Sequence, residues 1–223
     1  LPKKPTSHIA DKKYGFFQSE KAGYIDIANE LGLLKRSDKH LSFARHPLAF
    51  LVEAADDICY TIIDFEDGIN LGLIQEEFAL EYLIKLVKNG IDTKKYNELT
   101  TKEDRISYLR ALAIGSLIQD AVKVFMENED LILSGEFPYS LMDKSAYKAQ
   151  MDDIIKISIK NVYQSREVVE KEIIGYKVIN VLLDVFCIAY TNKANGSASN
   201  YDNLVLKELK VYKVYFVYIW SIW

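Results

Sequence analysis

The stretch RHPLAFLVEAADDICYTIIDFED, residues 45–67, decides the fold of this 223-residue chain. Its apolar residues recur every three or four positions, which is the period of an α-helix that turns one side toward a core. Pro47 suits the first turn of such a helix, because the N–H that proline lacks would have no partner there. Gly68 and Gly72 favour an end nearby. The sequence therefore predicts a helix from Pro47 to about Ile69.

Acidic side chains gather on one side of this predicted helix. At about 100° per residue, the side centred on Glu53 carries carboxylates and a tyrosine: Glu53, Asp56, Asp57, Tyr60, Asp64 and Asp67. The other side carries the apolar residues Leu51, Val52, Ala55, Ile58, Cys59, Ile62, Ile63 and Phe65. Glu66 points away from the acidic side and is expected at the surface.

Two interpretations of the acidic side remain open. It is a solvated surface, or it is a site for a divalent cation or a metal–polyphosphate complex, since such ions prefer carboxylate ligands. Like charges three or four positions apart destabilise a helix by roughly 0.2–0.5 kcal/mol per pair. Neutralising Asp56 or Asp64 should therefore raise the melting temperature, whereas Glu66→Gln should change it little.

The composition is that of an ordinary globular protein. Hydrophobic residues make up 49% and charged residues 27%, which excludes a disordered, collagenous or coiled-coil chain. Gly and Pro number only 10 and 4, so helix breakers are rare. The net charge of −4 argues against a domain built mainly to coat nucleic-acid phosphate. The composition and periodicity together predict an all-α fold.

The remaining periodicity predicts further helices over Ser19 to Leu34, Gln75 to Lys88, Thr101 to Asn128 and Leu204 to Lys210. Asp143 to Ser165 and Glu167 to Tyr190 are predicted as two more helices or one kinked helix. We expect them to form one multi-helix bundle over residues 1–210. Residues 211–223, with the sequence VYKVYFVYIWSIW, are rich in aromatic and β-branched residues and predict a strand-like or irregular tail of unknown role.

Cysteine use and hydropathy favour a cytoplasmic protein. Cys59 and Cys187 lie in apolar runs and are expected to be buried thiols in a reducing compartment. No apolar stretch approaches 18 residues, so no membrane-spanning segment is expected, and the chain shows no signal peptide. It begins at Leu1 without a Met, and we expect it to be part of a longer protein.

Two stretches carry a resemblance to a known family. The first consists of Arg45–Leu48, Leu51–Tyr60 and Asp64–Asp67, and the second of Val162–Val169, Glu172–Gly175 and Leu182–Leu183. Together with Lys13–Phe17, they resemble the bacterial dGTP triphosphohydrolases of the HD-domain superfamily, over roughly residues 8–207. The resemblance implies an HD-domain-like helical bundle that cleaves a deoxynucleoside triphosphate into deoxynucleoside and tripolyphosphate.

The resemblance also implies roles for single residues. Asp56 matches the last ligand of a metal site, Mg²⁺ or Mn²⁺, whose other ligands are a His and a His-Asp pair. Tyr60 and Asp64 match positions that face the deoxyribose, with the carboxylate accepting a hydrogen bond from the 3′-hydroxyl. Tyr163 matches a second substrate-facing tyrosine. Three residues near it match loosely and would meet phosphate or base: Lys160, Gln164 and Arg166.

The chain departs from this family in its histidines. His8, His40 and His46 are the only ones, and none is followed by Asp. The missing ligands would then lie upstream of Leu1, and the chain alone is expected to be inactive, with its catalytic residues unknown. Two interpretations of Arg45 remain open: it contacts phosphate, or it forms a salt bridge in a loop.

A non-catalytic alternative also stands. The chain would then be a helical scaffold, or a module that binds nucleotide or single-stranded DNA and oligomerises. The family resemblance implies a homo-oligomer, and no membrane partner is expected. An in-frame His…His-Asp upstream of Leu1 would discriminate the enzyme from the scaffold.

Overall fold

The computed structural model describes residues 8–11, 15–37, 41–87 and 90–207. The tail predicted for 211–223 and the loop residue His40 lie outside these ranges. The chain divides after Tyr163 into two compact units, and each is described by itself. Apart from one short hairpin, the regular structure of the described residues is helical. This confirms the predicted all-α class, while a domain boundary at residue 210 stays a prediction.

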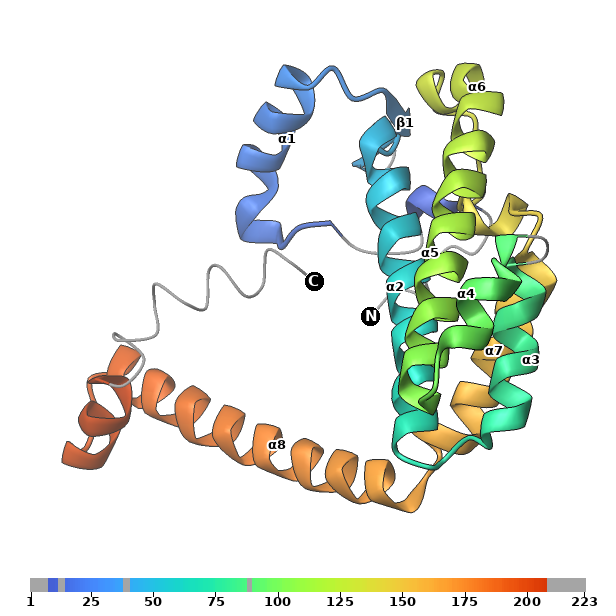
Figure 1. The fold of residues 1–223 in the computed structure, drawn as a ribbon. Coiled ribbons are helices and arrows are strands. Elements are labelled where there is room, and N and C mark those ends of the chain that lie inside the picture. Colours follow the sequence, from blue (N-terminus) through green and yellow to red (C-terminus); the bar gives the residue numbers. More distant parts are fainter. Residues whose placement is uncertain (1–7, 12–14, 38–40, 88–89, 208–223) are drawn as a thin grey trace. The chain divides into compact units, whose positions relative to one another are not determined.

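Two long helices form the centre of the first unit, α2 (Pro47–Asn70) and α5 (Lys102–Glu127), which lie side by side (Figure 1). The buried residues of α5 recur every three or four positions: Ile106, Leu109, Ala113, Leu117, Ala121 and Val124. They share one core with Ile58, Ile62 and Phe65 of α2. α3 (Glu76–Val87) packs against α5, and α7 (Lys148–Ser158) packs against α2.

Local sequence signals set the starts of the two central helices. His46 caps α2, because its Nδ1 accepts a hydrogen bond from the N–H of Leu48 at 3.2 Å. Pro47 occupies the first turn, as predicted. Thr101 caps α5 through a hydrogen bond that its hydroxyl accepts from the N–H of Asp104 at 3.1 Å, the ordinary role of a threonine at this position.

Shorter elements connect and flank these helices in the first unit: η1 (Ile9–Asp11), η2 (Gln18–Glu20), α1 (Lys21–Glu30), β1 (Lys35–Ser37), β2 (Ser42–Phe43), α4 (Thr93–Glu98), α6 (Glu129–Leu133), η4 (Met142–Lys144) and the π-helix η5 (Ile159–Tyr163). The antiparallel β1–β2 hairpin and α4 were not predicted, because elements this short show no period. The start predicted for α7, Asp143, is too early, since the helix begins at Lys148.

The second unit contains α8 (Arg166–Ala194) and a helix over residues 200–207. Ser165 caps α8 by accepting a hydrogen bond from the N–H of Val168 at 3.4 Å. Asp202 accepts hydrogen bonds from the backbone N–H and the hydroxyl of Ser199, both at 2.8 Å. These bonds, the backbone one foremost, hold the pKa of the Asp202 carboxyl below its usual value.

Two expectations are wrong: that no apolar stretch approaches 18 residues, and that both cysteines are buried. By length and composition, α8 is apolar enough to cross a membrane, since an 18-residue window of it has a mean hydropathy of 1.7. Lys177 and Asp184 are the only charged residues between Ile173 and Tyr190. The cysteines, expected to be buried, are both exposed. An apolar neighbourhood in the sequence therefore does not fix which side of a helix faces the core.

Candidate functional site

The structure brings three of the predicted site residues together. The hydroxyl of Tyr163, at the end of η5, donates a hydrogen bond to the carboxylate of Asp64 on α2. The ring of Tyr60, one helical turn before Asp64, stacks on the ring of Tyr163 with centroids 6.3 Å apart and an interplanar angle of 29°. A carboxylate and two aromatic faces thus form one cluster, which we call the Tyr60–Asp64–Tyr163 cluster.

The π-helix brings Tyr163 into this cluster. The five residues of η5 follow directly on α7, and π-turns occur frequently at functional sites because they change the direction of side chains relative to an α-helix. Val162 is buried within this turn. The neighbouring Lys160 is exposed on the same turn, so its predicted contact with phosphate or base stays a prediction.

The surroundings of Tyr163 favour its neutral form. Burial removes water from its hydroxyl and is the main cause that raises its pKa. The hydrogen bond to Asp64 and the contact with Tyr60 raise the pKa further, because a second negative charge beside a carboxylate is unfavourable. Tyr163 therefore stays a hydrogen-bond donor over the whole physiological pH range.

We expect Tyr163 to make the chain less stable at alkaline pH. An ordinary tyrosine has a pKa of about 10, and the folded chain raises this value for Tyr163. Above pH 10 the unfolded chain releases the proton while the folded chain keeps it. The free energy of unfolding therefore falls with rising pH, by at most about 1.4 kcal/mol per pH unit. Tyr163→Phe should remove this contribution.

The measurement is urea denaturation followed by circular dichroism at several pH values from about 9 to about 11.5. Tyr176→Phe is the control for the loss of one tyrosine hydroxyl, because Tyr176 is exposed in the second unit. Equal slopes for wild type and Tyr163→Phe would contradict the environment described for Tyr163.

The acidic side of α2 does not behave as one surface. Glu53, Asp57 and Asp64 are half-buried, whereas Asp56 and Asp67 are exposed. Glu53 pairs with Arg45 at 2.7 Å, and the Arg45 guanidinium also lies over the ring of Phe50, 4.7 Å from its centroid. For Arg45 the structure therefore shows the salt bridge, and contact with phosphate stays a prediction.

A cleft of about 170 Å³ lies beside this half-buried edge of α2. It is lined by Glu53, Asp57, Thr61, Ser140, Met142, Asp143, Lys148, Met151, Asp152 and Ile155. Lys148 is the only cation among these lining residues, and it pairs with Asp152 at 2.5 Å. Sequence reasoning missed the cleft, because its far wall comes from η4 and α7, about ninety residues from α2 in the chain.

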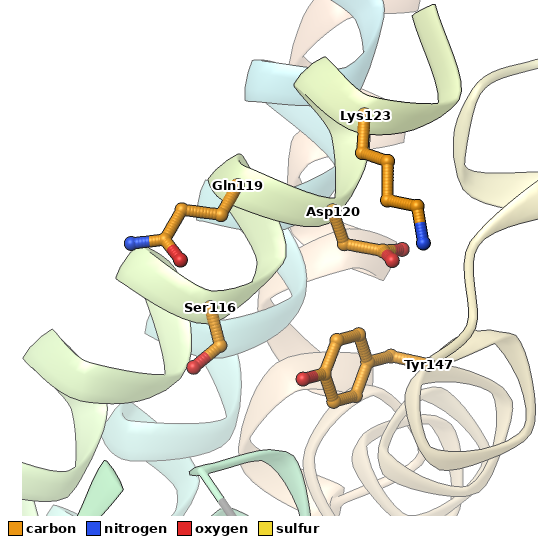
Figure 2. Close-up of a pocket in the computed structure, with 5 residues that line it drawn as sticks. All are labelled: Ser116, Gln119, Asp120, Lys123 and Tyr147. Carbon is orange, nitrogen blue, oxygen red and sulfur yellow. The ribbon is translucent and has the colours of Figure 1, made fainter. Parts of the chain in front are cut away.

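A second pocket, of about 350 Å³, lies on the exposed side of α5, and Figure 2 shows its lining residues Ser116, Gln119, Asp120, Lys123 and Tyr147. Asp120 accepts hydrogen bonds from the hydroxyl of Ser145 at 2.5 Å and from the N–H of Ala146 at 3.0 Å. Asp120 thus holds the segment that leads into α7, which is a structural role.

Asp56, the predicted metal ligand, lies in an exposed apolar surface. Val52, one turn before it, is 69% exposed, and Ile63, two turns after it, is 43% exposed. Cys59 and Ala55 are also exposed. Their predicted place on the buried side of α2 is wrong, because the core contacts the helix along Ala54, Ile58 and Phe65. Within the described residues, no group of three or more His, Cys, Asp or Glu side chains is placed to hold a metal ion.

The predicted surface position of Glu66 is wrong. It is buried, not at the surface, and its carboxylate pairs with the Arg110 guanidinium of α5 at 2.5 Å. The partner lies 44 residues away in the chain, so the period of α2 alone does not reveal it. Glu66→Gln is therefore unsuitable as a neutral control. Asp64→Asn also loses its expected stabilising effect, because Asp64 accepts a hydrogen bond from Tyr163.

Two predicted contacts belong to the second unit. Gln164 is exposed at its start. Arg166 opens α8, where its guanidinium pairs with Glu170 at 2.7 Å and both side chains are largely exposed. Their contacts with substrate stay predictions.

Curated proteins resemble the chain over most of its length. It is 36% identical over 182 residues to a deoxyguanosinetriphosphate triphosphohydrolase-like protein of Synechocystis, which covers 82% of the chain and 40% of the relative. A protein of the same description from Pseudomonas aeruginosa is 30% identical over 203 residues, or 88% of the chain and 45% of the relative. A deoxyguanosinetriphosphate triphosphohydrolase of Yersinia enterocolitica is 29% identical over 199 residues, or 82% and 38%. The chain spans about two fifths of the length of these relatives, and no family model matches it.

Proposed function

Since the chain belongs to the dGTP triphosphohydrolase family, we propose that it is part of a metal-dependent enzyme that converts dGTP and water into deoxyguanosine and tripolyphosphate. In this reaction a water oxygen bonds to the α-phosphorus and the bond from that phosphorus to the 5′-oxygen breaks. One water proton ends on the 5′-oxygen, and the other passes to tripolyphosphate or solvent. The proposed contribution of this chain is the sugar contacts and one metal ligand.

The Tyr60–Asp64–Tyr163 cluster is the observation that carries this proposal. A carboxylate has about four acceptor positions, and the Tyr163 hydroxyl uses one of them on Asp64. Asp64 therefore keeps room for a second donor, such as the 3′-hydroxyl of a deoxyribose. The two stacked rings beside it offer flat apolar faces of the kind that pack against a sugar or base.

The surroundings of Asp56 support a metal site that is completed by residues outside those described. One carboxylate does not hold a catalytic metal alone, since three protein ligands are typical. Asp56 is exposed between apolar neighbours, as expected of a surface that a further segment covers, and the relatives are more than twice as long as the matched region. A bound Mg²⁺ or Mn²⁺ would stabilise phosphate charge and lower the pKa of a bound water.

Two of the four carboxylates that line the cleft beside α2 are already paired, Glu53 with Arg45 and Asp152 with Lys148. Their charge therefore serves the structure of the cleft and carries no part of the proposed reaction. A cytoplasmic location, a homo-oligomeric state and binding of single-stranded DNA remain predictions.

The test measures how much the 3′-hydroxyl of the substrate contributes to kcat/KM, in a polypeptide of the relatives' full length. Asp64→Asn should lower kcat/KM for dGTP by about 10- to 100-fold, because a hydrogen bond to a charged group is worth about 1.5–3 kcal/mol. It should lower kcat/KM for 2′,3′-dideoxy-GTP much less, since that substrate has no 3′-hydroxyl to lose. Asp67→Asn, an exposed carboxylate on the same helix, is the control. Equal losses for the two substrates would refute the sugar contact.

A further inference from the structure

Two side chains lie very close to the backbone of Gly68 on α2, and the proposed reaction does not explain this contact. A Cβ atom at this position would lie 2.6 Å from Cγ2 of Val162 and 2.7 Å from Cδ1 of Ile74. Both distances are shorter than van der Waals contact, so the missing side chain leaves a notch that these two residues fill. Gly68 is buried and helical, so the notch, and not a turn, accounts for a glycine here.

Glycine inside a helix is less favourable than alanine, and a packing requirement is the usual reason for one. The side chain in the notch belongs to η5, where Val162 directly precedes Tyr163. On α2, Gly68 lies one turn after Asp64, the acceptor of the Tyr163 hydrogen bond. The notch and the hydrogen bond therefore join the same two segments at adjacent points.

We propose that Gly68 is a positioning residue, which admits Val162 into α2 and thereby sets the π-turn so that the Tyr163 hydroxyl meets Asp64. Val162 is β-branched and stiff at χ1, so it cannot turn away from an added methyl group without moving its backbone. That movement would carry Tyr163 with it. The importance of this placement for substrate rests on the proposed function, whereas the placement itself does not.

The direct test is a double-mutant cycle, which measures how strongly two side chains depend on each other. Tyr163→Phe, Asp64→Ala and the double variant are unfolded with urea in the wild-type chain and again in the Gly68→Ala chain. We expect the coupling between Tyr163 and Asp64 to fall by at least half in the Gly68→Ala chain. Adding Val162→Ala to Gly68→Ala removes the clash with Val162 and leaves only the one with the end of the flexible Ile74 side chain, so it should restore the coupling.

Gly115→Ala is the matched control. Gly115 is also helical, on α5, but an added Cβ meets no atom within 4 Å, so the coupling should stay at its wild-type value. An undiminished coupling in the Gly68→Ala chain would overturn the proposal, even if that chain were less stable. If Gly68→Ala does not fold, Val162→Ala alone is measured. It empties the notch without adding bulk and should also lower the coupling, and an unchanged value would again overturn the proposal.

A second measurement separates this inference from the proposed function. In a polypeptide of the relatives' full length, Gly68→Ala should reduce the preference for dGTP over 2′,3′-dideoxy-GTP about as much as Tyr163→Phe does. A lost coupling with an unchanged preference would confirm the positioning by Gly68 and refute the sugar contact of the cluster. A changed preference with an intact coupling would refute the positioning.

Discussion

Arg110→Ala is expected to lower the free energy of unfolding by about 3 kcal/mol. Its guanidinium pairs with Glu66 at 2.5 Å, and the Glu66 side chain is only 10% exposed. Removing the arginine leaves a carboxylate without a partner between α2 and α5, and breaking such a buried pair typically costs about 3–5 kcal/mol. We expect the lower end of that range, since the Arg110 side chain itself is 37% exposed.

An exposed ion pair in the same unit provides the control. Lys85 and Glu81 pair at 2.8 Å on α3, with side chains 50% and 60% exposed, and pairs this exposed contribute little to stability. Lys85→Ala should therefore change stability much less than Arg110→Ala in urea denaturation at the same pH. Similar losses for both variants would mean that Glu66 remains hydrated in the folded chain.

Asp56→Ala should abolish catalysis in a polypeptide of the relatives' full length. The proposed site loses a charged metal ligand, and we expect a fall in kcat/KM of about 1,000-fold, which corresponds to ~4 kcal/mol of transition-state stabilisation. Bound Mn²⁺, measured by calorimetry, should be lost in parallel. Asp67→Ala tests whether any exposed carboxylate of α2 has this effect and should retain activity. Tripolyphosphate release that survives Asp56→Ala would remove Asp56 from the metal site.

The sequence predicted what depends on neighbouring residues. Helix α2 begins at Pro47 as expected, and Thr101 caps α5, because caps and breakers act over a few positions. The side of α2 that faces the core was harder to predict. Val52 and Ile63 are as apolar as Ile58, but the packing of α5 and α7 decides that only Ile58 is buried.

In the candidate site too, some features were predicted from the sequence and others depend on distant residues. The resemblance to dGTP triphosphohydrolases identified Asp64 and Tyr163, and the structure joins them across 99 residues. The ion pair of Glu66, the cleft beside α2 and the notch at Gly68 had no local signal, because each depends on a side chain from a distant element. Periodicity shows which positions of a helix are apolar. Contacts with distant elements determine which of those positions are buried and which side chains pair.

The exposed thiol of Cys59 makes the Asp56 surface of α2 chemically addressable. Cys59 lies one helical turn after Asp56, and the chain's other cysteine, Cys187, belongs to the second unit. Since Cys187 is exposed too, a Cys187→Ser variant would direct a maleimide fluorophore to Cys59, beside the proposed metal ligand, without altering any residue of the Tyr60–Asp64–Tyr163 cluster. Any segment that covers this surface would shield the thiol. The rate of alkylation at Cys59 therefore measures directly whether this side of α2 is covered or exposed to solvent.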